Sequence, residues 1–592
     1  MTATLVHKLL TQAYAQHGQG QFAEAERLYT EVLELQPANS HALLFLGVLD
    51  LQRDETERGV EKIAQAAHVD PEFALAHYHL GNGFLTLQRP QEALASYDRA
   101  IGLQPDFAEA YHKRADALID LARAADALAN YDKAIVLKPD FAEAHGNRGL
   151  ALRALKRPGD ALASYDRAIA LNSAFAQAHH NRGNVMMDLK RPADALASFD
   201  RALALQPGFA DAHINRGLAL MELRRPADAL AAFDTAMELQ PSLAEAHLNR
   251  GLSLTELKQL EEALASFEQA IALRPGFIPA LWNKSHALLL LGRFEEGWRL
   301  HEYRKQLPEP IASRIYAQPA WLGAENIRGK TLLIESEQGF GDVIQFSRYA
   351  HLAQARGANV IFAVRSRMMR LMKSLEPPVD IVDSSALPPA FDFHIPLLSM
   401  PLALGTDGGT IPAAIPYLRA EPGRVATWKE KLGTHGFRIG ICWQGSTLGV
   451  TQGKPFSVAE FRAIAQIPGV RLISLQKGEG TEQLRDLPPG MVVESLGADF
   501  DSGAHAFVDT AAVMESLDLV ITTDTSVAHL AGALGRPAWV ALKYVPDWRW
   551  LLDRSDSPWY PTLCLFRQTE YDSWPEVFAQ MEARLRAQLA QK

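Results

Sequence analysis

A 34-residue period runs through the first half of the chain. Prolines, glycines and alanines each recur in their own register: Pro37, Pro71, Pro105, Pro139, Pro207, Pro241 and Pro275; Gly47, Gly81, Gly149, Gly183, Gly217 and Gly251; and the alanines at 93, 127, 161, 195, 229 and 263. Each period contains two apolar patterns with helical spacing. Small residues let two helices cross closely, and proline starts a new element. We therefore expect about eight helical hairpins over residues 4–305.

In its period and in the positions of glycine, alanine and proline, this segment resembles the tetratricopeptide repeat. The resemblance implies a superhelix with a concave groove that takes an extended peptide or a partner helix. We predict that residues 1–305 form an α-solenoid of this kind and engage in protein–protein interaction.

Asparagines recur two residues before the glycine, on the first helix of each repeat, whose exposed face lines the groove: Asn147, Asn181, Asn215, Asn249 and Asn283. A side-chain amide can pair with any peptide backbone. The array resembles that of the O-linked N-acetylglucosamine transferase, which holds its substrate polypeptide with such an asparagine ladder. The sequence leaves open whether the column binds peptide or is a solvated polar position copied by repeat duplication.

A histidine column follows the same period: His77, His145, His179, His213 and His247. Equivalent residues of successive repeats are separated by at least a helix-packing distance of about 8–10 Å, which is too far for a shared metal ion. We interpret this column as packing or as the edge of the groove.

Length and composition limit the remaining possibilities. A chain of 592 residues, 48% hydrophobic and 22% charged, is too long for one core and predicts two to four domains. A net charge of −10 argues against a nucleic-acid binder. Two cysteines, no signal-peptide pattern and no long apolar window predict a cytoplasmic protein with no transmembrane segment.

From Gly329 onward, strand and helix patterns alternate. We predict strands at 331–336, 359–364, 380–383, 438–443, 470–475, 491–495, 519–522 and 538–542, and helices at 342–356, 367–375, 458–466, 510–516, 527–534 and 574–591. This alternation predicts parallel sheets covered on both faces, in two Rossmann-like lobes. We expect a linker or collar at 306–328, an N-terminal lobe at 329–430 and a C-terminal lobe at 431–592, with the last helix packing back on the first lobe.

Four loops at the carboxyl ends of predicted strands would face the cleft between the lobes. Their notable residues are Gly339, Gly341 and Asp342; Trp443, Gln444 and Ser446, followed by Lys454; Gln476 and Lys477; and Asp524, Thr525 and Ser526, which open a helix containing His529. The free N–H groups at a helix start suit a diphosphate. A dinucleotide fingerprint is incomplete, because Ile344 occupies the third glycine position and Arg365 stands where NAD favours an acidic residue. An oxidoreductase is therefore disfavoured.

The pairs Gly341-Asp342 and Asp524-Thr525, together with Lys454 and His529, resemble the heptosyltransferases, which are inverting glycosyltransferases of the two-lobe GT-B fold. A longer pattern resembles bacterial glycosyltransferases in which a tetratricopeptide array precedes such a domain: Glu337-Gln-Gly-x-Gly-Asp, Asp524-Thr-Ser-x-Ala-His-Leu-Ala-Gly-Ala-Leu-Gly, Pro546-Asp-Trp-Arg-Trp and Ser557-Pro-Trp-Tyr-Pro. The resemblance implies an enzyme that moves a sugar from a nucleotide sugar to an acceptor, here a polypeptide hydroxyl recruited by the array.

The resemblance also implies roles for individual residues. Asp342 is the base that accepts the acceptor proton. Lys454 and the helix after Asp524 receive the leaving diphosphate without a metal, and the nucleotide sugar is a co-substrate, so no cofactor is expected. The other singled-out residues of the four loops are expected to bind the nucleotide sugar: Gly339, Gly341, Trp443, Gln444, Ser446, Gln476, Lys477, Asp524, Thr525, Ser526 and His529. Two alternatives stay open: Asp342 is a plain helix cap, or the lobes are a degenerate transferase domain in a peptide-binding scaffold.

Overall fold

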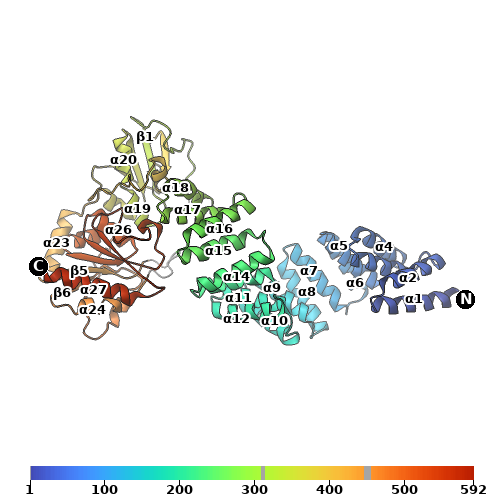
Figure 1. Ribbon diagram of the computed structural model, residues 1–592. Helices are drawn as coiled ribbons and strands as arrows, with labels where there is room; N and C mark the ends of the chain where they lie inside the picture. The colour runs from blue at the N-terminus through green and yellow to red at the C-terminus, as the bar shows by residue number, and fades with distance from the viewer. Residues whose placement is uncertain (1, 308–313, 446–454, 592) are drawn as a thin grey trace. The chain divides into compact units, whose positions relative to one another are not determined.

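The computed structural model describes residues 2–307, 314–445 and 455–591. The chain forms two compact units, Met1–Pro241 and Ser242–Lys592 (Figure 1). No helix in these described ranges is long and apolar enough to cross a membrane.

Helices α1–α18 form nine hairpins within the described ranges, seven in the first unit and two in the second. Their bounds are α1 Thr2–Gly18, α2 Phe22–Leu35, α3 Ser40–Gln52, α4 Thr56–Val69, α5 Ala74–Thr86, α6 Pro90–Leu103, α7 Ala108–Asp120, α8 Ala124–Leu137, α9 Ala142–Ala154, α10 Pro158–Leu171, α11 Ala176–Asp188, α12 Pro192–Leu205, α13 Ala210–Glu222, α14 Pro226–Leu239, α15 Ala244–Glu256, α16 Leu260–Leu273, α17 Ile278–Leu290 and α18 Phe294–His301. The array has one hairpin more than the eight expected. Ala13 and Ser285 replace the periodic glycine in the first and last hairpins, which weakens the sequence pattern at both ends.

The periodic glycines lie where the two helices of a hairpin cross. A Cβ on Gly149 would stand 2.7 Å from Cζ of Tyr165. The Tyr165 ring is buried together with Ala161 and Ala168 of the same helix. Close contact between α9 and α10 therefore requires glycine at this crossing.

The histidine column fixes the turns between hairpins. Nε2 of His77 lies 3.1 Å from the carbonyl oxygen of Pro71, and Nε2 of His213 lies 2.9 Å from that of Pro207. The ring N–H donates to the turn that precedes its own helix. This geometry agrees with the packing interpretation.

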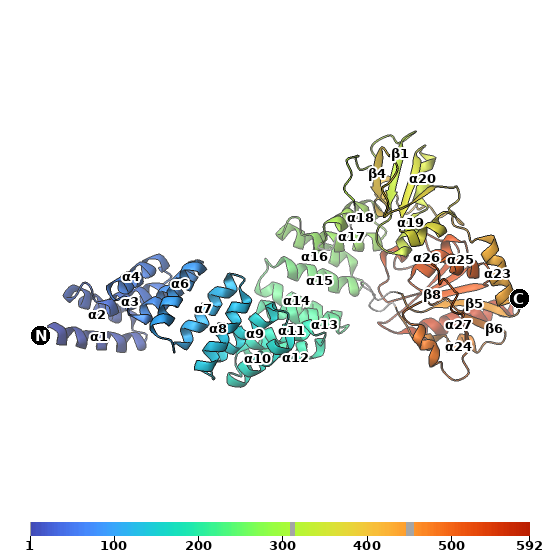
Figure 2. The ribbon, with the colours of Figure 1, turned by 180° about the vertical axis from the view of Figure 1, so that it is seen from behind.

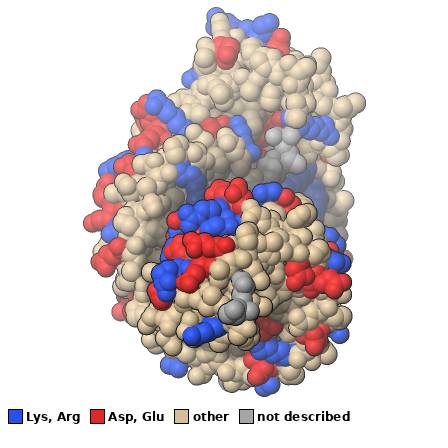
Figure 3. Space-filling view, turned by 90° about the vertical axis from the view of Figure 1, so that its right-hand side faces the viewer, with Lys and Arg blue, Asp and Glu red and all other residues tan. Residues whose placement is uncertain are grey.

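Charged side chains on the array surface are mostly paired. Arg148 of α9 bonds Asp132 of α8 in the preceding hairpin, and Arg182 bonds Asp166 in the same way one repeat later. On the face drawn in Figure 3, basic and acidic groups are interspersed. The visible surface therefore presents no extended field of one sign.

The first α/β lobe has a four-stranded parallel sheet in the order β3-β2-β1-β4. Its elements are β1 Thr331–Glu335, α19 Phe340–Phe346, α20 Tyr349–Ala355, β2 Asn359–Val364, α21 Ser366–Met372, β3 Asp380–Asp383, β4 Phe393–Pro396 and α22 Met400–Ala403. Strand β4 was not predicted, and the helix predicted at 342–356 is two helices. The collar segment joins this sheet, because the backbone N–H of the fully buried Trp321 donates to the carbonyl oxygen of His394 at 2.8 Å.

The second α/β lobe has a six-stranded parallel sheet in the order β10-β9-β8-β5-β6-β7. Its elements are α23 Pro422–Leu432, β5 Phe437–Cys442, α24 Arg462–Ala465, β6 Val470–Ser474, β7 Val493–Glu494, α25 Val508–Met514, β8 Leu519–Thr523, α26 Ser526–Ala533, β9 Ala538–Leu542, the 3₁₀ turn η5 Trp548–Trp550, β10 Leu563–Arg567 and α27 Trp574–Ala590. Helices α23, α25 and α26 cover one face, and α24 and α27 cover the other (Figure 2). Strand β10 was not predicted.

Two expectations about this lobe were wrong. Helix α27 packs on the second lobe and not on the first, because its apolar face, including Phe578 and Met581, joins the core beneath β5, β6 and β8. The lobe also begins earlier than residue 431, since Nε1 of Trp428 in α23 donates to Asp509 of α25 at 2.8 Å.

The last two hairpins of the array belong to the compact unit that contains the lobes, although the sequence suggested a boundary near residue 305. Nε1 of Trp298 in α18 donates to the carbonyl oxygen of Thr406 at 3.0 Å. The fully buried Arg304 donates to Glu337 at 2.6 Å, directly before the first cleft loop. These contacts attach the end of the array to the first lobe.

Candidate functional site

The predicted cleft loops lie where the strand order of each sheet reverses. β1 lies between β2 and β4, and β5 lies between β6 and β8. In open α/β sheets, ligands bind at the carboxyl ends of strands at such a switch point. Asp342 lies in the first turn of α19, which follows β1, and the loops after β5 and β8 contain Gln444 and Thr525.

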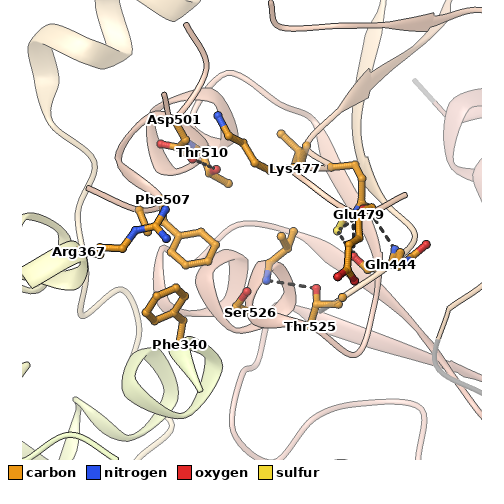
Figure 4. Close-up of a pocket in the computed structure, with 16 residues that line it drawn as sticks. Phe340, Arg367, Gln444, Lys477, Glu479, Asp501, Phe507, Thr510, Thr525 and Ser526 are labelled. Carbon is orange, nitrogen blue, oxygen red and sulfur yellow. Dashed lines mark hydrogen bonds between the residues drawn. The ribbon is translucent and has the colours of Figure 1, made fainter. Parts of the chain in front are cut away.

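An aromatic pocket of about 350 Å³ opens at the carboxyl ends of β5, β6 and β8. Phe340 of the first lobe meets Phe507 of the second edge to face, with ring centroids 5.9 Å apart (Figure 4). The residues that line it are Phe340, Arg367, Cys442, Gln444, Gly445, Leu475, Gln476, Lys477, Glu479, Asp501, Ala506, Phe507, Thr510, Thr525, Ser526 and Val527. Two aromatic rings beside polar loop groups suit a flat heterocycle.

A second pocket of about 370 Å³ lies on the other side of the α26 N-terminus, and we call it the carboxylate pocket. Apart from Gly341 its lining is polar: Gln338, Gly341, Asp342, Asp524, Thr525, Ser526, His529, Asp547 and Arg549. Thr525 and Ser526 line both pockets. The two pockets therefore meet at the first residues of α26.

Thr525 is the N-cap of α26, and its hydroxyl oxygen accepts from the N–H of Val527 at 3.3 Å. The predicted cap residues Asp524, Thr525 and Ser526 all lie at this helix start, and the cap role falls to the threonine. The N-terminal end of a helix carries a partial positive charge. An anionic group placed between the two pockets would meet that charge.

Asp342 lies in the first turn of α19, and both of its carboxylate oxygens have partners. Oδ2 accepts the N–H of Gly339 at 2.9 Å, and Oδ1 accepts from the guanidinium of Arg549. Burial raises the pKa of Asp342 above its usual range, and the charges of Asp547 and Glu337 add to this, while Arg549 and the Gly339 N–H oppose it. The carboxyl is thus a capping group and a buried acid in one residue.

His529 lies one turn into α26, stacked on Trp550 with ring centroids 5.4 Å apart. Its Nδ1 is 3.1 Å from the hydroxyl of Tyr560. Burial lowers the pKa of His529 to about 3, so the ring is neutral at pH 7. A Cβ on Gly341 would stand 3.0 Å from Cδ2 of this ring, so Gly341 is where α19 and α26 touch.

The polar groups of Gln476 and Trp443 bond to the backbone of the site loops, and Gln476 also lines the aromatic pocket. Oε1 of Gln476 accepts the backbone N–H groups of Trp443 at 3.1 Å and Gln444 at 3.0 Å, and its Nε2 donates to the carbonyl oxygens of Gln444 and Glu479. Trp443 is fully buried, and its Nε1 donates to the carbonyl oxygen of Gly480. The hydrogen bonds of both side chains hold the backbone of the loops after β5 and β6 in place.

The asparagine column lies half-buried or buried, and three of its members, Asn147, Asn181 and Asn215, bond to neighbouring side chains. Nδ2 of Asn147 lies 3.0 Å from Nε2 of His112 and from Asp116, and Nδ2 of Asn215 lies 2.8 Å from Nε2 of His180. Asn283 donates to the carbonyl oxygen of Pro279 within its own helix, and Asn181 is 8% exposed. Asn249 is half-buried. In this state the amide N–H groups of Asn147 and Asn215 serve the stacking of repeats.

Of the remaining predicted residues, Gln444 and Lys477 line the aromatic pocket, and Gly339 flanks the carboxylate pocket as the N-cap of α19. Nζ of Lys477 donates to the carbonyl oxygen of Phe500. Ser446 and Lys454 lie outside the described residues.

Arg549 of η5 and its N-cap Asp547 were not predicted as site residues, although the pattern Pro546-Asp-Trp-Arg-Trp contains both. Nη1 of Arg549 donates to Asp547 at 2.9 Å, and Nε donates to Oε1 of Gln345 at 2.7 Å. The concentration of aromatic and charged residues was the available signal. Phe340, Phe507 and Arg367 had no distinguishing pattern.

Comparison with known proteins identifies the array. Tetratricopeptide-repeat models match residues 10–58, 49–106, 180–244 and 214–276, and two further models of this repeat match 149–190 and 108–141. The N-terminal region therefore consists of tetratricopeptide repeats.

Among curated proteins, FlbA of Caulobacter vibrioides is 27% identical over 320 residues, which is 49% of this chain and 52% of FlbA. The chain thus spans about half the length of this relative. Similar solved structures are the tetratricopeptide protein YrrB, 26% identical over 32% of this chain and 97% of YrrB with a TM-score of 0.29, and the pilus biogenesis factor PilW, 24% identical over 35% and 96% with a TM-score of 0.33.

Proposed function

We propose that the lobes form an inverting GT-B glycosyltransferase that transfers a sugar from a nucleotide sugar to an acceptor, and that the array recruits a polypeptide acceptor. The carrying observation is the pair of pockets that meet at Thr525 and Ser526. The aromatic pocket would hold the nucleobase of the donor, the N-terminus of α26 would hold its diphosphate, and the buried carboxylate of Asp342 would lie beside its reacting carbon.

In this mechanism the acceptor oxygen attacks the anomeric carbon from the face opposite the diphosphate. The new carbon–oxygen bond forms as the bond to the diphosphate oxygen breaks, and the electron pair leaves with the diphosphate. Asp342 accepts the acceptor proton; burial raises its pKa, whereas its ion pair with Arg549 acts in the opposite direction. The N–H groups at the start of α26, with Lys454, receive the negative charge without a metal.

The aromatic pocket suits the nucleoside part of the donor. Phe340 and Phe507 offer apolar ring surface, while Gln444 and Lys477 offer polar groups at the loops after β5 and β6. The neutral His529 is placed to donate or accept a hydrogen bond near the diphosphate without adding charge.

The array is proposed to recruit the polypeptide, as tetratricopeptide repeats serve as peptide-binding scaffolds. For Asn147 and Asn215 to bind a peptide backbone, their amides must use the carbonyl oxygen or exchange their present partners. Two free cysteines, Cys442 and Cys564, suit the reducing cytoplasm, where we place the protein.

The test is a transfer assay with purified full-length protein, a panel of nucleotide sugars and protein acceptors captured on the array. Asp342→Asn should abolish transfer without weakening nucleotide binding, because the amide keeps the size and loses the basicity. A matched control is Asp407→Asn, which alters an exposed carboxylate in a turn that lines neither pocket. Transfer retained by Asp342→Asn would exclude it as the base.

A second candidate is a peptide-binding scaffold whose lobes have lost catalysis. The ion pair between Asp342 and Arg549 favours it, since the cation lowers the basicity of the proposed base. A scaffold would show neither nucleotide-sugar turnover nor a nucleotide-dependent rise in the thermal unfolding midpoint.

A further inference from the structure

Arg549 is the cation of the carboxylate pocket. Its side chain is 10% exposed and lies over the ring of Trp548, with Cζ 4.3 Å from the ring centroid. It reaches from the second lobe to Asp342 in the first lobe, and it also bonds Asp547 and Gln345. One guanidinium therefore links the proposed base to the donor side of the cleft.

This link opposes catalysis as long as it is intact. Oδ1 of Asp342 accepts from Arg549 while Oδ2 accepts the N–H of Gly339. A carboxylate held by a cation and an amide is a poor acceptor for a hydroxyl proton. The pair must open before Asp342 can act as a base.

The carboxylate pocket also contains groups that would bind a competing anion and so open the pair between Asp342 and Arg549. Thr525 and Ser526, at the start of α26, line the pocket together with Arg549. A diphosphate at this helix start would carry two or more negative charges, and arginine binds phosphate oxygens with two parallel N–H groups. Asp547 remains bonded to Nη1, so Nη2 can change partners without leaving the guanidinium unpaired.

Resting on the proposed transferase function, we propose that Arg549 is a latch: it pairs with Asp342 in the free protein and moves its Nη2 donor to the diphosphate of the bound donor. Donor binding thereby frees the carboxylate for the acceptor proton. The donor must then bind before a productive acceptor.

The charges around Asp342 strengthen the effect. Besides Arg549 and the Gly339 N–H, the groups that act on it are the carboxylates of Asp547 and Glu337. Both carboxylates and burial raise its pKa, so removal of the cation raises that pKa further. The base becomes stronger at the step that needs it.

Binding of nucleoside diphosphates tests the latch without knowledge of the sugar. Affinities of UDP, GDP, CDP and ADP are measured by titration calorimetry on the full chain. Arg549→Gln should weaken binding by about tenfold or more, since a charge-assisted bond to phosphate is lost. Asp342→Asn should tighten binding by several-fold, because Arg549 no longer has to leave a carboxylate. In the double variant this gain should disappear.

The controls separate the latch from a structural role. Arg554→Gln breaks a similar pair with Asp556, outside both pockets, and should leave affinity unchanged. Arg549→Lys should recover part of the lost affinity, and the thermal unfolding midpoint reports on folding. A merely structural link predicts that Asp342→Asn and Arg549→Gln weaken binding alike.

Three results would overturn the latch. Affinity unchanged by Arg549→Gln would show that this cation does not meet the diphosphate. Unchanged or weaker binding in Asp342→Asn would show that the two anions do not compete. Wild-type protein that binds none of the four diphosphates would remove the proposed function itself, together with the latch.

Discussion

Gly149→Ala and Gly159→Ala make the same chemical change within one hairpin of the array, and we expect opposite effects on stability. A Cβ on Gly149, in the middle of α9, would stand 2.7, 2.8 and 2.9 Å from three ring carbons of Tyr165. A Cβ on Gly159, in the first turn of α10, would meet nothing within 4 Å. The next two repeats carry Ala193 and Ala227 at the position of Gly159.

The magnitude follows from the overlap. Carbon atoms in contact lie about 3.5–4.0 Å apart, so the Tyr165 ring, 0% exposed, must move by about 1 Å. Overpacking of this kind costs about 1–3 kcal/mol. Replacing glycine by alanine in a helix contributes up to about 1 kcal/mol at either site. The two variants should therefore differ by about 1–3 kcal/mol, with Gly149→Ala the less stable.

Urea denaturation followed by circular dichroism gives the difference in the free energy of unfolding. Hydrogen exchange of the peptides covering α9 and α10 shows whether the loss is local, since each repeat contacts mainly its neighbours. If Gly149→Ala is as stable as Gly159→Ala, the ring of Tyr165 does not cover Gly149, and the deduced packing of the hairpin is wrong.

Two further predictions concern the second unit. Gln476→Ala leaves the buried N–H groups of Trp443 and Gln444 without their acceptor, and we expect the free energy of unfolding to fall by about 2–4 kcal/mol in urea titrations. The control is Gln466→Ala, which changes an exposed glutamine. An equal effect of both changes would contradict a stabilising role of the Gln476 hydrogen bonds. His529 has a pKa of about 3 when folded and about 6.5 when unfolded, so the unfolded state binds a proton between these values and stability falls as pH decreases from 6.5 to 3. This contribution is at most about 1.4 kcal/mol per pH unit. His529→Gln should show a shallower decline in denaturation midpoints, and an unchanged slope would mean that the folded protein already protonates this ring.

Strands with nearly continuous apolar runs, such as β2 and β9, are recognisable from the sequence alone. Strands β2, β3 and β9 have the predicted bounds. Strand β4 escaped because it is four residues long, follows a proline-containing segment and ends on Pro396. Strand β10 was not predicted, although its first four residues are apolar. Composition alone does not determine whether a short segment is a strand, because its neighbours in the sheet contribute to its stability.

The sequence predicted which loops and helix starts form the candidate site, but not which residues contact one another there. The loop residues Asp342, Thr525 and Ser526 could be singled out because each stands at a strand end or helix start. The sequence assigned Gln476 to ligand binding. Its hydrogen bonds to the backbone of the loop after β5 could not be foreseen, because they depend on how closely the ends of β5 and β6 approach each other. A glutamine in a loop has the same appearance in sequence whether its amide faces a ligand or a backbone.

The sequence alone determines the repeat array, because each repeat is a local unit whose glycine, alanine and proline positions specify contacts within it and with the next repeat. It also determines the alternation that builds parallel sheets. The tertiary structure decides what faces the cleft. Asp342 and Arg549 are 207 residues apart and meet where the two lobes contact each other, as α19 and α26 also do at Gly341. No pattern in the sequence predicts such a pair, because the pair depends on how the two lobes pack against each other.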